Sequence, residues 1–142
     1  MSAQVVPAEL HLFRCMSDNA GALLRDPATG RVAAIDVPDA DEVKAELDRM
    51  GWTLTDILIT HEHGDHIQGV KELKALTGAT VSGPAAAAAA AEPDRILTEG
   101  DHVALGDIDI EVWATPGHCP GHLCLVSKGA KLAFVGDVLF VM

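Results

Sequence analysis

The 142-residue sequence predicts a mixed α/β fold of two β-sheets with helices on their outer faces. Two observations point to this class. Strand-like segments open the chain, helix-like segments occupy its middle, and strands return in the last third. The composition, 49% hydrophobic and 22% charged, is that of an ordinary globular domain. We therefore expect a single domain over residues 1–142.

The N-terminal third predicts a β-meander followed by a helix. Strands are expected at residues 10–16, 21–25 and 32–37, with a turn at residues 26–30. Asp39 or Asp41 can cap the helix that follows, and Gly51 can end it. Its apolar positions repeat at helical spacing: Val43, Leu47 and Met50.

The remaining elements are predicted from the same periodicities. Residues 56–60 suggest a buried strand, and residues 70–76 suggest a helix that ends near Gly78. A short strand is expected at residues 80–82, and the seven consecutive alanines at 85–91 favour a helix. Further strands are expected at residues 102–105, 108–114, 123–127 and 132–135.

A cluster of metal-binding residue types follows the strand predicted at residues 56–60. It consists of His61, His63, Asp65 and His66. Histidine-rich turns also occur on plain solvated surfaces, but this one follows an apolar run and precedes a helical pattern. Imidazole and carboxylate groups are ligands that zinc, ferrous iron and manganese share. The spacing therefore indicates a metal site.

Two later strands end in residues of the same kinds. His118 and His122 follow the strand predicted at 108–114, and Asp137 follows the strand predicted at 132–135. A lone aspartate after a glycine is usually a turn residue. Strand ends that face one edge of a fold can meet, so we expect His118 and Asp137 to join the cluster near His61.

Charge and composition exclude several classes of partner. The net charge of −11 argues against nucleic-acid binding, which needs a basic surface. No apolar stretch is long enough to cross a membrane, so no membrane partner is expected. Cys15, Cys119 and Cys124 form no CxxC pair, and this favours a reducing compartment. A cytoplasmic protein is the expectation.

Ordered motifs along the chain resemble those of the metallo-β-lactamase-fold hydrolases, and most closely the glyoxalase II (hydroxyacylglutathione hydrolase) group. The matching segments are Cys15-Met16-Ser17-Asp18-Asn19, Thr60-His61-Glu62-His63-Gly64-Asp65-His66, Thr115-Pro116-Gly117-His118 with Gly121-His122, and Gly136-Asp137-Val138-Leu139-Phe140. The resemblance implies an αββα sandwich. It also implies a metal-dependent hydrolase that cleaves a small glutathione-type thioester by attack of a metal-bound hydroxide.

The resemblance also implies which residues bind metal. In such enzymes one ion is held by residues matching His61, His63 and His118, a second by residues matching Asp65, His66 and a later histidine, and a carboxylate matching Asp137 bridges both. Two zinc ions are expected, with iron or manganese as alternatives. Asp65 has a second expected role, as the catalytic group that orients the hydroxide and accepts its proton.

The largest departure from the family pattern is that the sequence stops five residues after Asp137. Family members usually continue further. We therefore expect a C-terminally truncated domain that lacks part of the second sheet. We also expect self-association, or binding of a complementary fragment, at the exposed edge of that sheet. Two alternative functions remain open. One is a mononuclear iron persulfide dioxygenase that uses His61, His118 and Asp137, and the other is an inactive metal-binding remnant. A β-lactam substrate is a weaker option.

Overall fold

The computed structural model describes residues 8–15, 19–35, 37, 39–59, 69–84, 93–114, 123–127, 132–135 and 138–141. Within these residues the first sheet has the strand order β1-β2-β3-β4-β5-β6. Its strands are β1 (Glu9–Cys15), β2 (Asn19–Arg25), β3 (Val32–Ile35), β4 (Asp56–Leu58), β5 (Thr80–Gly83) and β6 (Arg95–Ile96). Strands β1 to β3 form the predicted antiparallel meander, and β3 to β6 are parallel.

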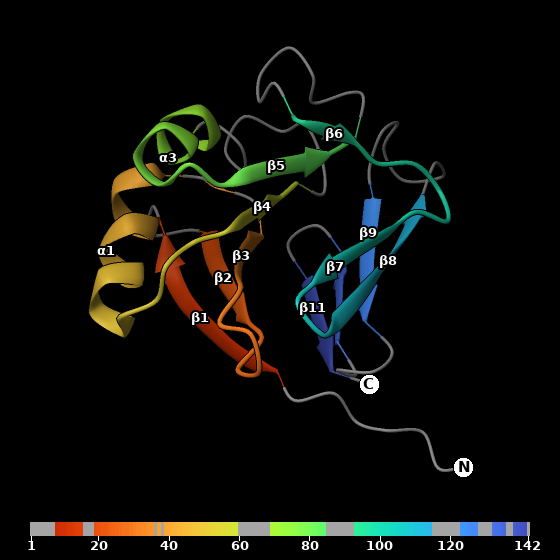
Figure 1. Cartoon of the computed structure of the whole chain (residues 1–142), viewed down its shortest axis with the longest axis horizontal. Helices are drawn as coiled ribbons and strands as arrows, with labels where there is room; N and C mark the ends of the chain where they lie inside the picture. The colour runs from red at the N-terminus through yellow and green to blue at the C-terminus, as the bar shows by residue number, and fades with distance from the viewer. Residues whose placement is uncertain are drawn as a thin grey trace.

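The second sheet is antiparallel throughout and has the order β11-β10-β9-β8-β7. Its strands are β7 (His102–Leu105), β8 (Ile108–Ala114), β9 (Leu123–Ser127), β10 (Leu132–Val135) and β11 (Val138–Val141). Figure 1 shows this sheet on one side of the first sheet and the helices α1 (Ala40–Met50) and α3 (Val70–Thr77) on the other.

Side-chain alternation along the strands builds two hydrophobic cores from one sheet. Leu23 and Ile57 belong to the core beneath the helices, whereas the adjacent Leu24 and Leu58 belong to the core between the two sheets. All four side chains are 0% exposed. Each such burial stabilises the fold by about 1.5–3 kcal/mol relative to exposure. The first sheet is therefore fixed on both faces.

The ends of helix α1 follow its local sequence. The Asp39 side chain accepts a hydrogen bond from the Glu42 N–H at 3.0 Å, so Asp39 is the N-cap. Gly51 closes the helix at φ +71°, a backbone conformation that favours glycine. Val43 and Leu47 face the core, and both are 1% exposed.

A buried carboxylate connects the two sheets at the turn between β2 and β3. Asp26 is 0% exposed and accepts hydrogen bonds from Thr29 Oγ1 at 2.8 Å and from the Asp107 N–H at 2.7 Å. Asp107 lies in the turn between β7 and β8. At the neighbouring Gly106, φ is +61°, and a β-carbon would collide with the Asp26 carboxylate. The two turns therefore fit together through backbone and carboxylate contacts.

The predicted strands and helices are confirmed with small shifts. Strand β2 begins at Asn19 rather than at 21, and β4 ends at Leu58 rather than at 60. Strand β11 was not predicted, because its four apolar residues resemble a loose apolar tail until β10 is seen beside them. The alanine run at 85–91 lies outside the described residues.

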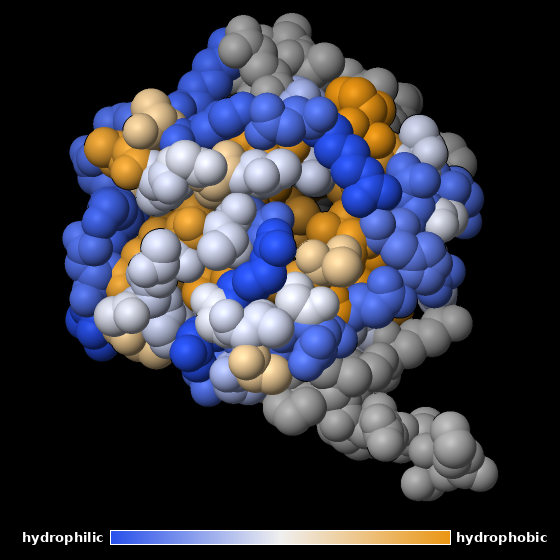
Figure 2. Space-filling view, in the orientation of Figure 1, coloured by the Kyte–Doolittle hydropathy of each residue, from blue (hydrophilic) through white to orange (hydrophobic). Residues whose placement is uncertain are grey.

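The described surface agrees with the composition. Hydrophilic side chains cover much of the face shown in Figure 2, and apolar atoms appear mainly between them. None of the helices in the described part of the chain is long and apolar enough to cross a membrane.

Candidate metal centre

The six predicted ligands lie outside the residues that the structure describes. They are His61, His63, Asp65, His66, His118 and Asp137. The predicted catalytic role of Asp65 is therefore also outside them. The structure does describe the strands and helix that lead into and out of the three segments that contain these residues.

Strand β4 is the buried element that leads into the histidine cluster. The chain continues from Leu58 to Ile59, whose N–H donates to the Ser82 carbonyl oxygen at 2.9 Å. Both Leu58 and Ile59 are 0% exposed. Gly83 of β5 lies against the Ile59 side chain, and a β-carbon at Gly83 would be 2.9 Å from Ile59 Cβ. The entry to the segment 60–68 is therefore held by a hydrogen bond and by close packing.

The exit from that segment is held in a similar way. Gly69 precedes helix α3, and its N–H donates to the Val37 carbonyl oxygen at 2.9 Å. A β-carbon at Gly69 would be 2.6 Å from the Ala40 backbone nitrogen. Both ends of the segment thus contact buried backbone.

The strands before the other two motifs, β8 and β10, stop at the same end of the second sheet. Trp113 of β8 is opposite Cys124 of β9, and Cys124 is opposite Val135 of β10. The last residues of the two strands, Ala114 and Val135, therefore lie at the same end of the sheet, with only β9 between them. Adjacent strands are about 4.8 Å apart, so the backbones of β8 and β10 are separated by about 10 Å.

Packing between the sheets brings this end of the second sheet close to the end of β4. Leu58 shares the inter-sheet core with Val112, which is two residues before the end of β8, and with Leu125 of β9. In Figure 1, β4 and β5 point toward the end of the molecule where β8 stops and β9 begins. The described ends of the three segments, Ile59, Ala114 and Val135, consequently lie in one region.

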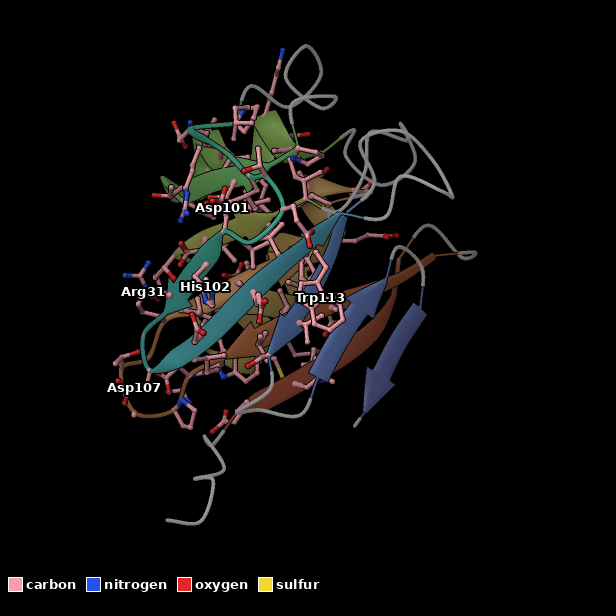
Figure 3. The ribbon with its side chains drawn as sticks, turned by 90° about the vertical axis from the view of Figure 1, so that its right-hand side faces the viewer. Arg31, Asp101, His102, Asp107 and Trp113 are labelled. Atoms are coloured by element: carbon pink, nitrogen blue, oxygen red, sulfur yellow. The ribbon has the colours of Figure 1, made fainter. Side chains whose placement is uncertain are left out.

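Two histidines outside the motifs, His11 and His102, pair with carboxylates of the described residues. The His102 side chain is 55% exposed, and its Nδ1 lies 2.9 Å from Asp109 Oδ2. Figure 3 shows His102 and Trp113 on β7 and β8, where they alternate with the buried inter-sheet residues. His11 Nε2 lies 2.7 Å from Glu46 Oε2. Among the described residues, no group of three His, Cys, Asp or Glu side chains could hold a metal ion.

Two buried carboxylates that support this arrangement were not predicted from the sequence. Hydrogen bonds to Asp26, chiefly from the Asp107 N–H, lower the pKa of its carboxyl below the usual value. Asp56, which is 6% exposed, begins β4 and accepts from Arg31 at 2.9 Å and from Thr55 Oγ1 at 2.7 Å. The sequence marks Asp26 as a turn residue, but it does not reveal a partner 81 positions away.

Comparison with known proteins agrees with the motif resemblance. Residues 12–142 match the family model described as "Metallo-beta-lactamase superfamily". The chain is 51% identical over 135 residues to a protein named hydroxyacylglutathione hydrolase from Methylobacterium sp. (strain 4-46), covering 94% of this chain and 53% of that protein. It is 46% identical to the protein of that name from Rhodopseudomonas palustris (strain CGA009), covering 95% and 53% respectively.

A solved structure shares the fold. The crystal structure of ETHE1 from Myxococcus xanthus superposes with a TM-score of 0.79 at 30% sequence identity, covering 94% of this chain and 59% of that one. The chain spans about half the length of the curated relatives it matches. The family match covers more than nine-tenths of the chain and includes all four segments that carry the motif resemblance. The chain therefore belongs to the metallo-β-lactamase superfamily.

Proposed function

We propose that this chain carries the metal-binding half of a hydrolase for glutathione thioesters of hydroxy acids. The observation that carries the proposal is the 51% identity over 135 residues to a protein named hydroxyacylglutathione hydrolase. Convergence of the ends of β4, β8 and β10 on one region supports it. The reaction class is hydrolysis, in which water adds to the thioester carbonyl, the carbon–sulfur bond breaks, and a carboxylic acid and a thiol form.

The proposed ligands fit a metal by their chemistry and by their position along the chain. Four imidazoles and two carboxylates are borderline ligands suited to zinc, iron or manganese. His61 follows Ile59 by two residues, and Asp137 follows Val135 by two. Two residues of extended chain reach about 7 Å. The ends of β8 and β10, about 10 Å apart, can therefore supply ligands to one centre. Packing of Leu58 against the core that contains Val112 brings the end of β4 to the same region.

We assign His61, His63 and His118 to one ion, Asp65 and His66 to a second, and Asp137 to both. Zinc is the proposed metal. Bound metal ions would lower the pKa of water toward neutrality and polarise the thioester carbonyl. Asp65 would orient the attacking water and accept its proton. A thiolate is a good leaving group, so no protein acid is required at the sulfur.

The test measures metal content and thioester cleavage in the same preparations. We expect the purified chain to bind zinc and to release thiol from a hydroxyacylglutathione in a chelator-sensitive reaction. His61→Ala should lose both properties. His102→Ala is the matched control, because His102 is an exposed histidine on the outer face of the second sheet. Full zinc binding by the chain without any thiol release would exclude the thioester hydrolase.

The same preparations separate the two alternative functions. One ferrous ion per chain with oxygen consumption on a persulfide would indicate the dioxygenase. Substoichiometric metal without turnover would indicate a remnant. No observation favours either alternative over the hydrolase. The relatives named hydroxyacylglutathione hydrolase align with 94–95% of this chain.

We also propose that the chain associates through the second sheet. Among the described strands β11 is at the edge of that sheet, so one side of its backbone has no partner strand there. Unpaired edges recruit further strands, either from a second copy or from a complementary fragment. Sedimentation equilibrium should show an assembly larger than one chain, and a stable, fully active monomer would contradict this.

The cysteine content favours the cytoplasm, which cell fractionation would test.

A further inference from the structure

Gly69 occupies a position where a larger residue does not fit. A β-carbon there would be 2.6 Å from the Ala40 backbone nitrogen, 2.9 Å from Val37 Cγ1 and 3.1 Å from the Asp39 carbonyl carbon. The backbone torsions of Gly69, φ −95° and ψ 0°, are open to any residue. Glycine is therefore required here by the space available and not by its conformational freedom.

The backbone that Gly69 contacts is itself rigidly held. Val37 is 0% exposed and Ala40 is 2% exposed, and Asp39 caps helix α1. The Gly69 N–H donates to the Val37 carbonyl oxygen at 2.9 Å. Gly69 thus lies where the start of helix α1 meets the start of helix α3, directly after the segment that contains His61, His63, Asp65 and His66.

A second glycine constrains the opposite end of the same segment. A β-carbon at Gly83 would be 2.9 Å from Ile59 Cβ and 3.3 Å from Ile59 Cδ1. Ile59 is the last described residue before the histidine cluster, and its N–H donates to the Ser82 carbonyl oxygen next to Gly83. Here the closest contact is 0.3 Å longer than the 2.6 Å contact at Gly69, and it is made to a side-chain carbon of the buried Ile59 rather than to a backbone nitrogen.

We propose that Gly69 and Gly83 are positioning residues of the metal centre. They allow the residues on either side of positions 60–68, Gly69 and Ile59, to lie close to α1 and β5, and this fixes the two points from which the proposed metal-binding segment extends. The inference rests on the proposed metal centre. It adds that metal affinity depends on two residues that contact neither metal nor substrate.

The size of the expected effect follows from the distances. Moving a β-carbon at position 69 from 2.6 Å to an ordinary contact of 3.4 Å requires a shift of at least 0.8 Å. Metal–ligand distances tolerate only about 0.2 Å. Loss of outer supporting groups typically weakens metal binding about 10- to 100-fold. We therefore expect Gly69→Ala to weaken zinc binding by at least about tenfold.

Gly78→Ala is the matched control. Gly78 ends the same helix that Gly69 precedes, and nothing lies within 4 Å of a β-carbon built there. Its φ of +73° makes alanine unfavourable, so this variant destabilises helix α3 without pressing on the histidine segment. It separates a loss of ligand position from a general loss of stability.

The experiment measures zinc affinity by competition with a chromophoric chelator, together with thermal unfolding of each metal-free variant. We expect Gly69→Ala to bind zinc at least about tenfold more weakly than the parent chain, and Gly78→Ala to bind within about twofold. Equal affinities of Gly69→Ala and the parent would overturn the proposal, and so would equal weakening in both variants.

Gly83→Ala keeps the proposal testable if Gly69→Ala does not fold, because the added methyl group meets its nearest neighbour, Ile59 Cβ, at 2.9 Å rather than at 2.6 Å and so demands a smaller shift. The same weakening of zinc binding is expected, and parental affinity in Gly83→Ala would then overturn the proposal. Failure of the parent chain itself to bind zinc is a different result. It would contradict the proposed metal centre rather than the role of the two glycines.

Discussion

Replacing Asp26 with asparagine tests how the two sheets are held together. The Asp26 carboxylate is fully buried and receives three hydrogen bonds. Oδ2 accepts from Thr29 Oγ1 and from the Asp107 N–H, and Oδ1 accepts from the Ala28 N–H at 3.1 Å. All three partners are donors. An amide group in this place turns one acceptor into a donor that faces another donor.

The expected cost is about 3 kcal/mol in the free energy of unfolding at neutral pH. Two hydrogen bonds to a charged oxygen become bonds to a neutral one, at about 1 kcal/mol each. The bond from the Ala28 N–H is lost, which adds about 1 kcal/mol. Because Asp26 itself is 0% exposed, bulk water has no direct access to the group that loses its partner.

The effect of the Asp26→Asn substitution should depend on pH in a defined direction. The hydrogen bond from the Asp107 N–H holds the pKa of Asp26 below its ordinary value of 3.8 in the folded protein. A lowered folded pKa stabilises the protein above the unfolded pKa, and this stability is lost as the pH falls through the folded pKa. The difference between the parent chain and D26N should therefore be largest near neutrality and shrink below about pH 4.

Urea unfolding at several pH values from neutral to acid measures this difference. D109N is the matched control, because the Asp109 side chain is 66% exposed. We expect the control to remain within about 0.5 kcal/mol of the parent at neutral pH. A D26N variant as stable as the parent, or a difference that stays constant into the acid range, would show that Asp26 does not connect the sheets as an ionised acceptor.

Three further changes test the core, a half-buried ion pair and the metal. Leu58→Ala should destabilise the fold by about 3 kcal/mol, because Leu58 is 0% exposed between the sheets. The control is Leu76→Ala, at a side chain that is 53% exposed, and it should cost less than about 1 kcal/mol in the same urea titration. Arg31→Ala should cost about 1–3 kcal/mol, because it leaves the buried Asp56 without its guanidinium partner, and Lys44→Ala, at an exposed pair, should cost about 0.5 kcal/mol or less. Chelation should lower the melting temperature of the zinc-loaded chain, since metal at a hundredfold excess over Kd stabilises by about 2.7 kcal/mol. An unchanged melting temperature after chelation would contradict folded-state metal binding.

Much of the fold could be predicted because its signals are local. The Asp39 cap, the repeat of Val43 and Leu47, and Gly51 together predict helix α1, and the structure has it at Ala40–Met50. The apolar residues after His102, bounded by the turn residues Gly106 and Asp107, likewise predict a strand at 102–105, and the structure has β7 at His102–Leu105. Strand β11 could not be predicted in the same way, because four apolar residues form a strand only when β10 lies beside them.

The sequence predicted that the site binds metal, but it did not predict the packing contacts on either side of the metal-binding segments. Imidazoles and carboxylates close together in sequence indicate metal binding without any knowledge of the fold. The contact between Gly69 and Ala40 depends on two helices that meet across 29 positions of sequence, a distance at which local patterns carry no signal. The register that aligns the ends of β8 and β10 is likewise visible only once β9 lies between them.

Zinc K-edge X-ray absorption on the zinc-loaded chain tests most directly whether the three strand ends supply one metal centre. Nitrogen and oxygen ligands at about 2.0–2.1 Å with several imidazoles are expected. His118→Ala should reduce the imidazole scattering by one ligand, because His118 belongs to a different strand end from His61 and His63. An unchanged spectrum in His118→Ala would show that the histidines near position 61 bind zinc alone, and the shared centre would be wrong.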